Sequence, residues 1–277
     1  MPERYTSPNR GRRSARARRR RRERSSGHIC RRRCRCYRCQ RHDHGGRRRR
    51  RRSDRLLGAN HVKTWPAPDY CIIGEPSSWD QICLGYRGTI SFEYVLRQDS
   101  RHTAGPGESV AEQAVTYWTA LTARLAAING DAAGFNAIGP SLRSFNTSGD
   151  GLQDEARLSI GLRLPPSIGS HQILPIVHEL AGKAEITVFG VQEGYQTDKR
   201  SPLTAPFLRA IRARGGTPRF TRKLGTSDMS VVGPVWQCPI VAYGPGDSSL
   251  DHTPEERIVI DDYLSAVWIL TEVLNTL

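Results

Sequence analysis

Residues 87–197 carry the clearest pattern of apolar and polar positions in the chain. Residues 88–96 alternate between apolar and polar side chains, which predicts a half-buried strand. Residues 109–128 carry apolar side chains at helical spacing, which predicts an amphipathic helix. The same patterns predict further strands at 141–146, 156–164 and 184–191 and a second helix at 171–182. This order of elements is typical of a compact α+β layer domain with a split β-α-β arrangement.

The flanking segments, residues 56–86 and 198–277, also alternate between strand and helix patterns. Short apolar runs bounded by Gly or Pro predict strands, and longer amphipathic runs predict helices. The predicted elements are strands at 70–73, 82–86 and 239–243 and helices at 203–214 and 254–277. We therefore expect an α/β domain, built from both flanking segments, that is interrupted by a smaller α+β domain at residues 87–197.

Residues 1–55 have almost no apolar periodicity and cannot bury a core. They contain 24 arginines and four acidic residues, so their formal charge is +20. The formal charge of the whole chain is +15, so the rest of the chain has a formal charge of −5. Only this basic arm could therefore bind nucleic acid through its net charge. No apolar run reaches the ~20 residues of a membrane span, and no apolar signal-peptide core is present, so we expect a cytoplasmic protein without membrane association.

The basic arm also contains a cluster of cysteines and histidines. Its members are Cys30, Cys34, Cys36, Cys39, His42 and His44. Such clusters can bind zinc, but the single residue between Cys34 and Cys36 fits no common zinc module, which favours a disordered arm. Residues 47–52 are consecutive arginines, the product expected when acidic GAG codons are read out of frame. Our hypothesis is that residues 1 to about 55 are a frameshifted or mis-started reading of an acidic segment.

Two residues on predicted loops are candidate metal ligands. Glu75 follows the strand at 70–73, and open α/β sheets bind ligands outside the carboxyl ends of their strands. His252 lies on a loop rich in Gly, Pro, Asp and Ser, and neutral imidazole is the commonest metal ligand. The alternatives are a solvated loop carboxylate for Glu75 and a surface histidine beside a helix N-cap at Thr253 for His252.

Three other positions carry groups suited to binding or catalysis. His102 lies on a loop between a strand and a helix, where it could donate to a developing oxyanion or simply be exposed. The Gly225-Thr226-Ser227 turn follows a basic strand that contains Arg219, Arg222 and Lys223, and it could bind a carboxylate or cap a helix. Arg163, on a strand with apolar alternate positions, could bind a carboxylate in bidentate geometry or form a surface salt bridge.

Taken in order, these motifs resemble those of the di-zinc amidohydrolases of the acetylornithine deacetylase, succinyl-diaminopimelate desuccinylase and carboxypeptidase G family. The matching motifs are Gly74-Glu75-Pro76, Tyr86-Arg87-Gly88, His102 with Ala104-Gly105-Pro106, Leu162-Arg163-Leu164-Pro165-Pro166, Gly225-Thr226-Ser227-Asp228-Met229 and Asp251-His252-Thr253-Pro254-Glu255. The resemblance covers roughly residues 58–277 and looks strongest to hydrolases that release lysine or ornithine from an amino-group carrier protein. Each motif is weak singly, but their order and spacing make the set specific.

The resemblance implies a zinc-binding α/β domain that is interrupted by a dimerisation, or lid, domain. It implies two zinc ions per active site, or cobalt in their place, with Glu75 as a ligand of one ion and His252 as a ligand of the other. His102 would reach the active site of the partner subunit in a homodimer and polarise the scissile carbonyl. The positions that would hold the substrate are Asn146, Arg163, Gly225, Thr226 and Ser227. A zinc-bridging hydroxide would attack the amide carbonyl, with a glutamate as general base.

The family pattern also places a His-x-Asp pair, a bridging Asp and a Glu-Glu pair before the Gly-Glu-Pro motif, and this sequence lacks them. The predicted function is a metal-dependent amidohydrolase that releases lysine or ornithine from an N-acyl amide or an acidic carrier protein in amino-acid biosynthesis, with weak or no activity in this chain as written. The alternative is a nucleic-acid-binding protein that uses the basic arm, with the remainder as a dimerisation scaffold; deleting residues 1–55 would then abolish salt-dependent binding.

Overall fold

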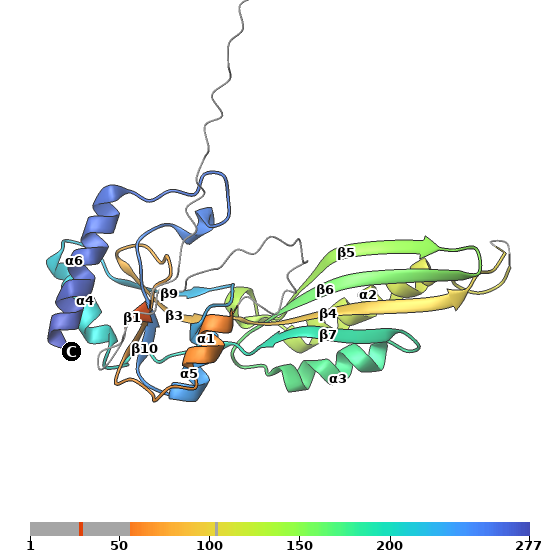
Figure 1. Ribbon diagram of the computed structural model, residues 1–277, viewed down its shortest axis with the longest axis horizontal. Helices are drawn as coiled ribbons and strands as arrows, with labels where there is room; N and C mark the ends of the chain where they lie inside the picture. Colours follow the sequence, from red (N-terminus) through yellow and green to blue (C-terminus); the bar gives the residue numbers. More distant parts are fainter. Residues whose placement is uncertain (1–27, 30–55, 103–104) are drawn as a thin grey trace, which may run out of the picture.

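The computed structural model of the protein describes residues 28–29, 56–102 and 105–277. Two β-sheets, each packed against helices, lie side by side along the long axis of the molecule (Figure 1). Within the described residues no helix is long and apolar enough to cross a membrane. The predictions of a disordered arm, of a frameshift and of a Cys/His cluster concern residues that lie outside the described part, apart from 28–29.

The elements agree with the mixed α/β fold that the hydrophobic pattern predicts. In chain order they are β1 (His28–Ile29), α1 (Leu57–Val62), β2 (Cys71–Ile73), β3 (Gln81–Tyr86), β4 (Gly88–Asp99), α2 (Val110–Asn129), the 3-10 helix η2 (Gly134–Asn136), β5 (Gly139–Gly149), β6 (Gln153–Leu164), α3 (Ser170–Leu180), β7 (Glu185–Gln192), β8 (Tyr195–Gln196), α4 (Thr204–Ala213), β9 (Arg219–Lys223), α5 (Met229–Trp236), β10 (Ile240–Ala242), the 3-10 helix η3 (Ser248–Leu250) and α6 (Ile260–Thr276). The short elements β1, α1, η2, β8, α5 and η3 are additions to the predicted set.

The larger sheet has the strand order β1-β2-β10-β3-β8, and β9 pairs with β3. Its central strands are covered on both faces, by α4 and α6 on one side and by α1 and α5 on the other (Figure 1). Ile72 packs toward α4 and α6, whereas its neighbours Cys71 and Ile73 pack toward α1 and α5. This burial on both faces explains why β2 is a continuous apolar run rather than an alternating one.

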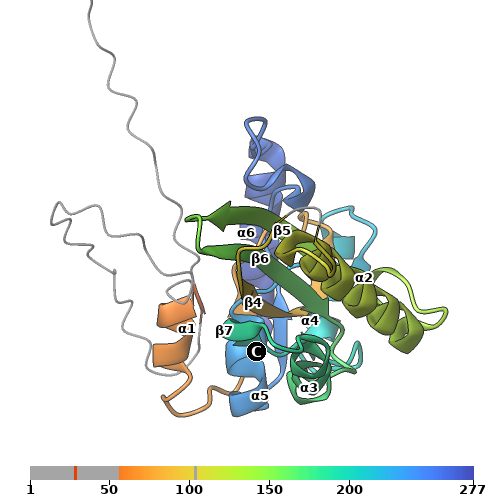
Figure 2. The same ribbon diagram turned by 90° about the vertical axis from the view of Figure 1, so that its right-hand side faces the viewer.

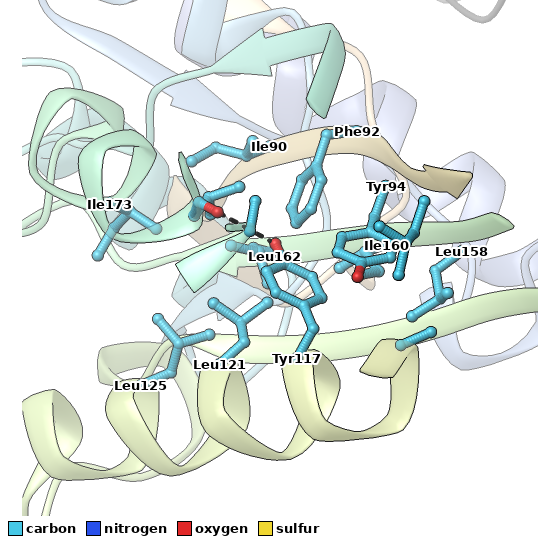
Figure 3. Packing of buried hydrophobic residues seen from close by; sticks show 14 of the residues in the cluster. Ile90, Phe92, Tyr94, Tyr117, Leu121, Leu125, Leu158, Ile160, Leu162 and Ile173 are labelled. Atoms are coloured by element: carbon cyan, nitrogen blue, oxygen red, sulfur yellow. Dashed lines mark hydrogen bonds between the residues drawn. The ribbon is translucent and has the colours of Figure 1, made fainter. Parts of the chain in front are cut away.

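The smaller sheet is antiparallel, with the order β5-β6-β4-β7. Helices α2 and α3 cover one of its faces (Figure 2). Between the sheet and the helices, alternate residues of β4 and β6 interlock with the apolar side of α2, and Tyr94 stacks on Tyr117 with ring centroids 4.4 Å apart (Figure 3). The opposite face, here called the open face, carries polar residues that include Thr89, Ser91 and Arg163.

Helix α2 begins at a capping box, as the Ser-x-x-Glu spacing requires. Ser109 Oγ accepts a hydrogen bond from Glu112 N at 3.2 Å, and Ser109 N donates to Glu112 Oε2 at 2.8 Å. We expect Ser109→Ala to lower the free energy of unfolding by about 1 kcal/mol, because one N-terminal amide loses its partner. Urea denaturation measures this change. Ser109→Asp, which keeps an acceptor, should lose less; equal losses in both variants would contradict the capping role.

The predicted start of the C-terminal helix at residue 254 is wrong, because α6 begins at Ile260. The Thr253 hydroxyl turns back and donates to Leu250 O at 2.8 Å, so it does not cap a helix. Glu256 N donates to Thr253 O at 3.2 Å, which makes a turn rather than a helical hydrogen bond. The segment between His252 and α6 is therefore a loop, and the alternative reading of Thr253 as a helix N-cap is also wrong.

Candidate functional site

A cavity of about 1430 Å³ lies between the loops at one edge of the larger sheet and the open face of the smaller sheet. One wall consists of the loops that follow β2, β9 and β10. The other wall consists of residues from β4, β6 and β7 together with Arg143 of β5. Each sheet thus supplies part of the lining, so the shape of the cavity depends on how the two sheets are held together.

Two loops meet on the first wall because β2 and β10 are parallel neighbours whose carboxyl ends lie at the same sheet edge. Ser77 N donates to Gly244 O at 2.9 Å, and Gly244 N donates to Ser77 Oγ at 3.3 Å. A Cβ atom at Gly244 would lie 2.8 Å from the backbone oxygen of Glu75, so the loops can approach this closely only with glycine there. This contact brings the predicted metal ligands Glu75 and His252 into the lining of one cavity.

His252 has a backbone φ of 65°, in the left-handed region that few residues other than glycine adopt. Its backbone N–H donates to Glu256 Oε2 at 3.4 Å, and its side chain is exposed at the cavity. Such backbone conformations concentrate at functional sites, where the surrounding structure holds them in place. The loop therefore holds His252 in an uncommon backbone conformation with its side chain at the cavity.

Lys223, at the end of β9, lies beside the acidic groups of the first wall. Its ammonium group donates to Pro76 O at 2.5 Å. Burial lowers the pKa of Lys223, and the nearby carboxylates of Asp251, Glu75 and Asp247 oppose that shift. The sequence reveals a basic strand at this point but no role for Lys223, because its neighbours come from two loops that are distant in the sequence, those after β2 and β10.

The described residues do not by themselves complete a metal site. Glu75 and His252 both line the cavity, but within residues 28–29, 56–102 and 105–277 no group of three or more His, Cys, Asp or Glu side chains is arranged to hold a metal ion. A catalytic zinc ion usually has three protein ligands, so the predicted pair is fewer than one such ion requires. The donor types suit zinc, whereas the number of donors does not.

Only some of the residues predicted to bind substrate line the cavity. Arg163, Gly225 and Thr226 line the cavity. Ser227 is buried behind the lining, and its hydroxyl oxygen accepts a hydrogen bond from Met229 N, at the first residue of α5, at 3.2 Å. The turn therefore presents Gly225 and Thr226 to the cavity while Ser227 supports the start of a helix, the role that was its alternative.

His102 and Asn146 do not line the cavity of their own chain. Strand β4 leaves the cavity at Thr89 and ends at Asp99, and at about 3.3 Å per residue this separates its ends by roughly 30 Å. His102 follows that far end, and Asn146, paired with Arg157, also lies along the extended part of the smaller sheet (Figure 1). Both side chains are exposed. A single copy of the chain thus keeps them apart from Glu75 and His252.

Comparison with protein families gives one matching family model, described as peptidase family M20/M25/M40, over residues 49–276. Among curated proteins, the chain is 40% identical to a LysW-lysine hydrolase of Deinococcus radiodurans, over 79% of this chain and 62% of the relative. It is 34% identical to a putative LysW-lysine/LysW-ornithine hydrolase of Thermococcus kodakarensis, over 76% of this chain and 56% of the relative. The chain therefore spans about three fifths of the length of these relatives.

Solved structures share the fold. A tripeptidase from Staphylococcus aureus superposes with a TM-score of 0.61 at 18% identity, over 80% of this chain and 60% of its own. An M20 family metallo-carboxypeptidase from Sulfolobus solfataricus superposes with a TM-score of 0.61 at 17% identity, over 78% of this chain and 65% of its own. At these identities the likeness concerns the architecture, which both structures have in common with the described residues.

Proposed function

The chain belongs to peptidase family M20/M25/M40, and we propose from this that it acts in a metal-dependent amidohydrolase that releases lysine or ornithine from an N-acyl or carrier-linked amide. The observation that carries the proposal is the cavity in which Glu75 and His252 share one wall and Arg163 lies on the other. The names of the relatives support lysine or ornithine as the amino acid released. In this role Arg163 would bind the carboxylate of that amino acid through two parallel hydrogen bonds.

The proposed metal is zinc, two ions per site, with cobalt as the alternative. Glu75 would be a ligand of one ion and His252 of the other, because carboxylate and imidazole groups are both ligands that zinc accepts. Since these two donors are fewer than a catalytic zinc requires, the ligands still needed would come from outside the described residues. The backbone amides and the hydroxyl group of Gly225 and Thr226 would hold polar groups of the amide beside the metals.

The proposed partners are a second copy of this chain and an acidic amino-group carrier protein. The dimer would form through the smaller sheet, whose edge strand β5 is exposed at every residue except Gly139. Such an unpaired edge is a surface on which another strand can pair. A second copy placed there would explain why His102 and Asn146 are remote from their own cavity, because they would serve the cavity of the partner. The carrier follows from the LysW-linked substrates in the names of the relatives.

The nucleic-acid alternative is not favoured. The family model covers residues 49–276, and the curated relatives reported above are named as hydrolases. Only the basic arm supports nucleic-acid binding, through charge alone, and it precedes the matched range almost entirely.

Lysine release tests the proposed function directly. We expect purified protein supplied with zinc to release lysine from Nα-acyl-lysine, and to stop when a chelator is added. The rate should be at least about tenfold below that of the Deinococcus radiodurans relative, because the zinc ligands are incomplete. Free lysine is quantified by mass spectrometry, and bound zinc by elemental analysis. If the protein neither binds nor cleaves any of the acyl-lysines, the proposed function is wrong. If each chain binds two zinc ions tightly, the conclusion that the set of zinc ligands is incomplete is wrong.

A further inference from the structure

Arg143 occupies an irregular position in the pairing of β5 with β6. Leu142 pairs with Ile160 and Ser144 pairs with Ser159, so Arg143 is an extra residue that opposes no residue of β6. A bulge of this kind bends the strand and redirects the side chain of the inserted residue. Here the redirected side chain is an arginine that lines the cavity.

Gly161 provides the space that this arginine occupies. A Cβ atom at Gly161 would lie 2.1 Å from Nη2 and 2.4 Å from Cζ of Arg143, so the guanidinium group lies where a side chain at 161 would be. Arg143 Nη1 then donates to the hydroxyl of Ser91 at 3.2 Å. Ser91 is the neighbour of Gly161 on β4 and is itself buried. The bulge, the glycine and the serine together fix the guanidinium group across the open face.

This position places two arginines on one wall of the cavity. Arg163 is two residues from Gly161 on β6, so it lies on the same face, about 7 Å further along the strand. The facing wall carries the carboxylates of Glu75, Asp247 and Asp251 around Lys223. The cavity is therefore cationic on the side of the smaller sheet and mainly anionic on the side of the loops.

From this arrangement we propose that Arg143 is a second carboxylate-binding residue, which selects amides whose acyl group carries a carboxylate of its own. The inference rests on the proposed function, in which Arg163 binds the carboxylate of the amino acid. The second carboxylate would belong to the acyl part, as in succinyl or glutamyl amides, and would bind the planar guanidinium group held over Gly161. A neutral acyl group such as acetyl has no anion to place there.

Calorimetric titration with two ligands of equal size tests the inference. Nα-succinyl-lysine carries the extra carboxylate, and Nα-succinamyl-lysine replaces it with a neutral amide. We expect the unaltered protein to bind the succinyl ligand about tenfold more tightly, because a charge-assisted hydrogen bond is stronger than a neutral one. Arg143→Met should remove this preference while leaving the affinity for the succinamyl ligand nearly unchanged. Arg163→Met should weaken the binding of both ligands.

The control is Arg124→Met, an exposed arginine of α2 on the covered side of the sheet, which should leave both affinities unchanged. Free lysine is measured in the same samples, so that turnover is not counted as binding. A preference that persists in Arg143→Met, or no preference in the unaltered protein, overturns the role of Arg143 and leaves the proposed function standing. Failure of both ligands to bind, or unchanged binding of both in Arg163→Met, overturns the proposed function as well.

Discussion

Glu75→Gln is expected to weaken zinc binding at least about 100-fold, because a neutral amide oxygen replaces the carboxylate that we propose as a zinc ligand. Glu75 lies two residues beyond β2, in a loop that hydrogen bonds to the loop after β10, so the substitution leaves its position supported. Competition with a chromophoric zinc chelator measures the dissociation constant. Asp262→Asn is the matched control, since Asp262 lines the same cavity but is not a proposed ligand.

His252→Asn should weaken zinc binding to a similar extent. Asparagine tolerates the left-handed backbone that His252 adopts, so the variant removes the imidazole and keeps the loop conformation. Loss of affinity can then be assigned to the missing ligand rather than to a rearranged loop. If Glu75→Gln, His252→Asn and Asp262→Asn all bind zinc as the unaltered protein does, the assignment of Glu75 and His252 as ligands is wrong.

Most of the fold was predictable because the side of a helix or strand that is buried determines the spacing of apolar residues along the sequence. Strand β4 alternates because only one of its faces packs on α2, and β2 is continuously apolar because both of its faces are covered. Helix α5 was not predicted, since it has eight residues and contains Gly233 and Pro234, both poor helix formers. Its helical state depends on tertiary packing, through buried residues such as Met229 and Val232, which no local pattern reveals.

The candidate site was predictable where a motif lies at the end of a regular element or on a loop of distinctive composition, as for His252. Glu75 and Arg163 were found because they belong to recognisable strands or strand ends, and the structure brings both to one cavity. Arg143 was missed because its direction depends on a bulge and on the space above Gly161. The distance of His102 from the cavity of its own chain depends on the full length of β4, and the sequence indicated it only through the family resemblance, which places His102 at the partner's site.

Gly88→Ala should lower the free energy of unfolding by about 2–3 kcal/mol, the usual cost of forcing extra volume into a well-packed region. Gly88 lies where the chain passes from β3 of the larger sheet into β4 of the smaller one. A Cβ atom there would lie 2.4 Å from Gln192 O, 2.6 Å from Gly194 N and 2.8 Å from the carbonyl carbon of Glu193. All three atoms belong to the backbone of the segment that leads from β7 of the smaller sheet back to β8 of the larger one. No side chain can therefore rotate to relieve the contact.

The same substitution should also weaken ligand binding, because the two connections that touch at Gly88 hold the two walls of the cavity together. Urea denaturation and calorimetric titration with Nα-succinyl-lysine measure the two effects separately. Gly58→Ala in α1 is the control: no atom lies within 4 Å of its added Cβ, and alanine favours a helix by up to about 1 kcal/mol. If Gly88→Ala is as stable as Gly58→Ala, the backbone around residues 192–194 can shift at little cost to make room for the added Cβ atom. Full stability loss with unchanged ligand affinity would show instead that the cavity does not depend on how the sheets are joined.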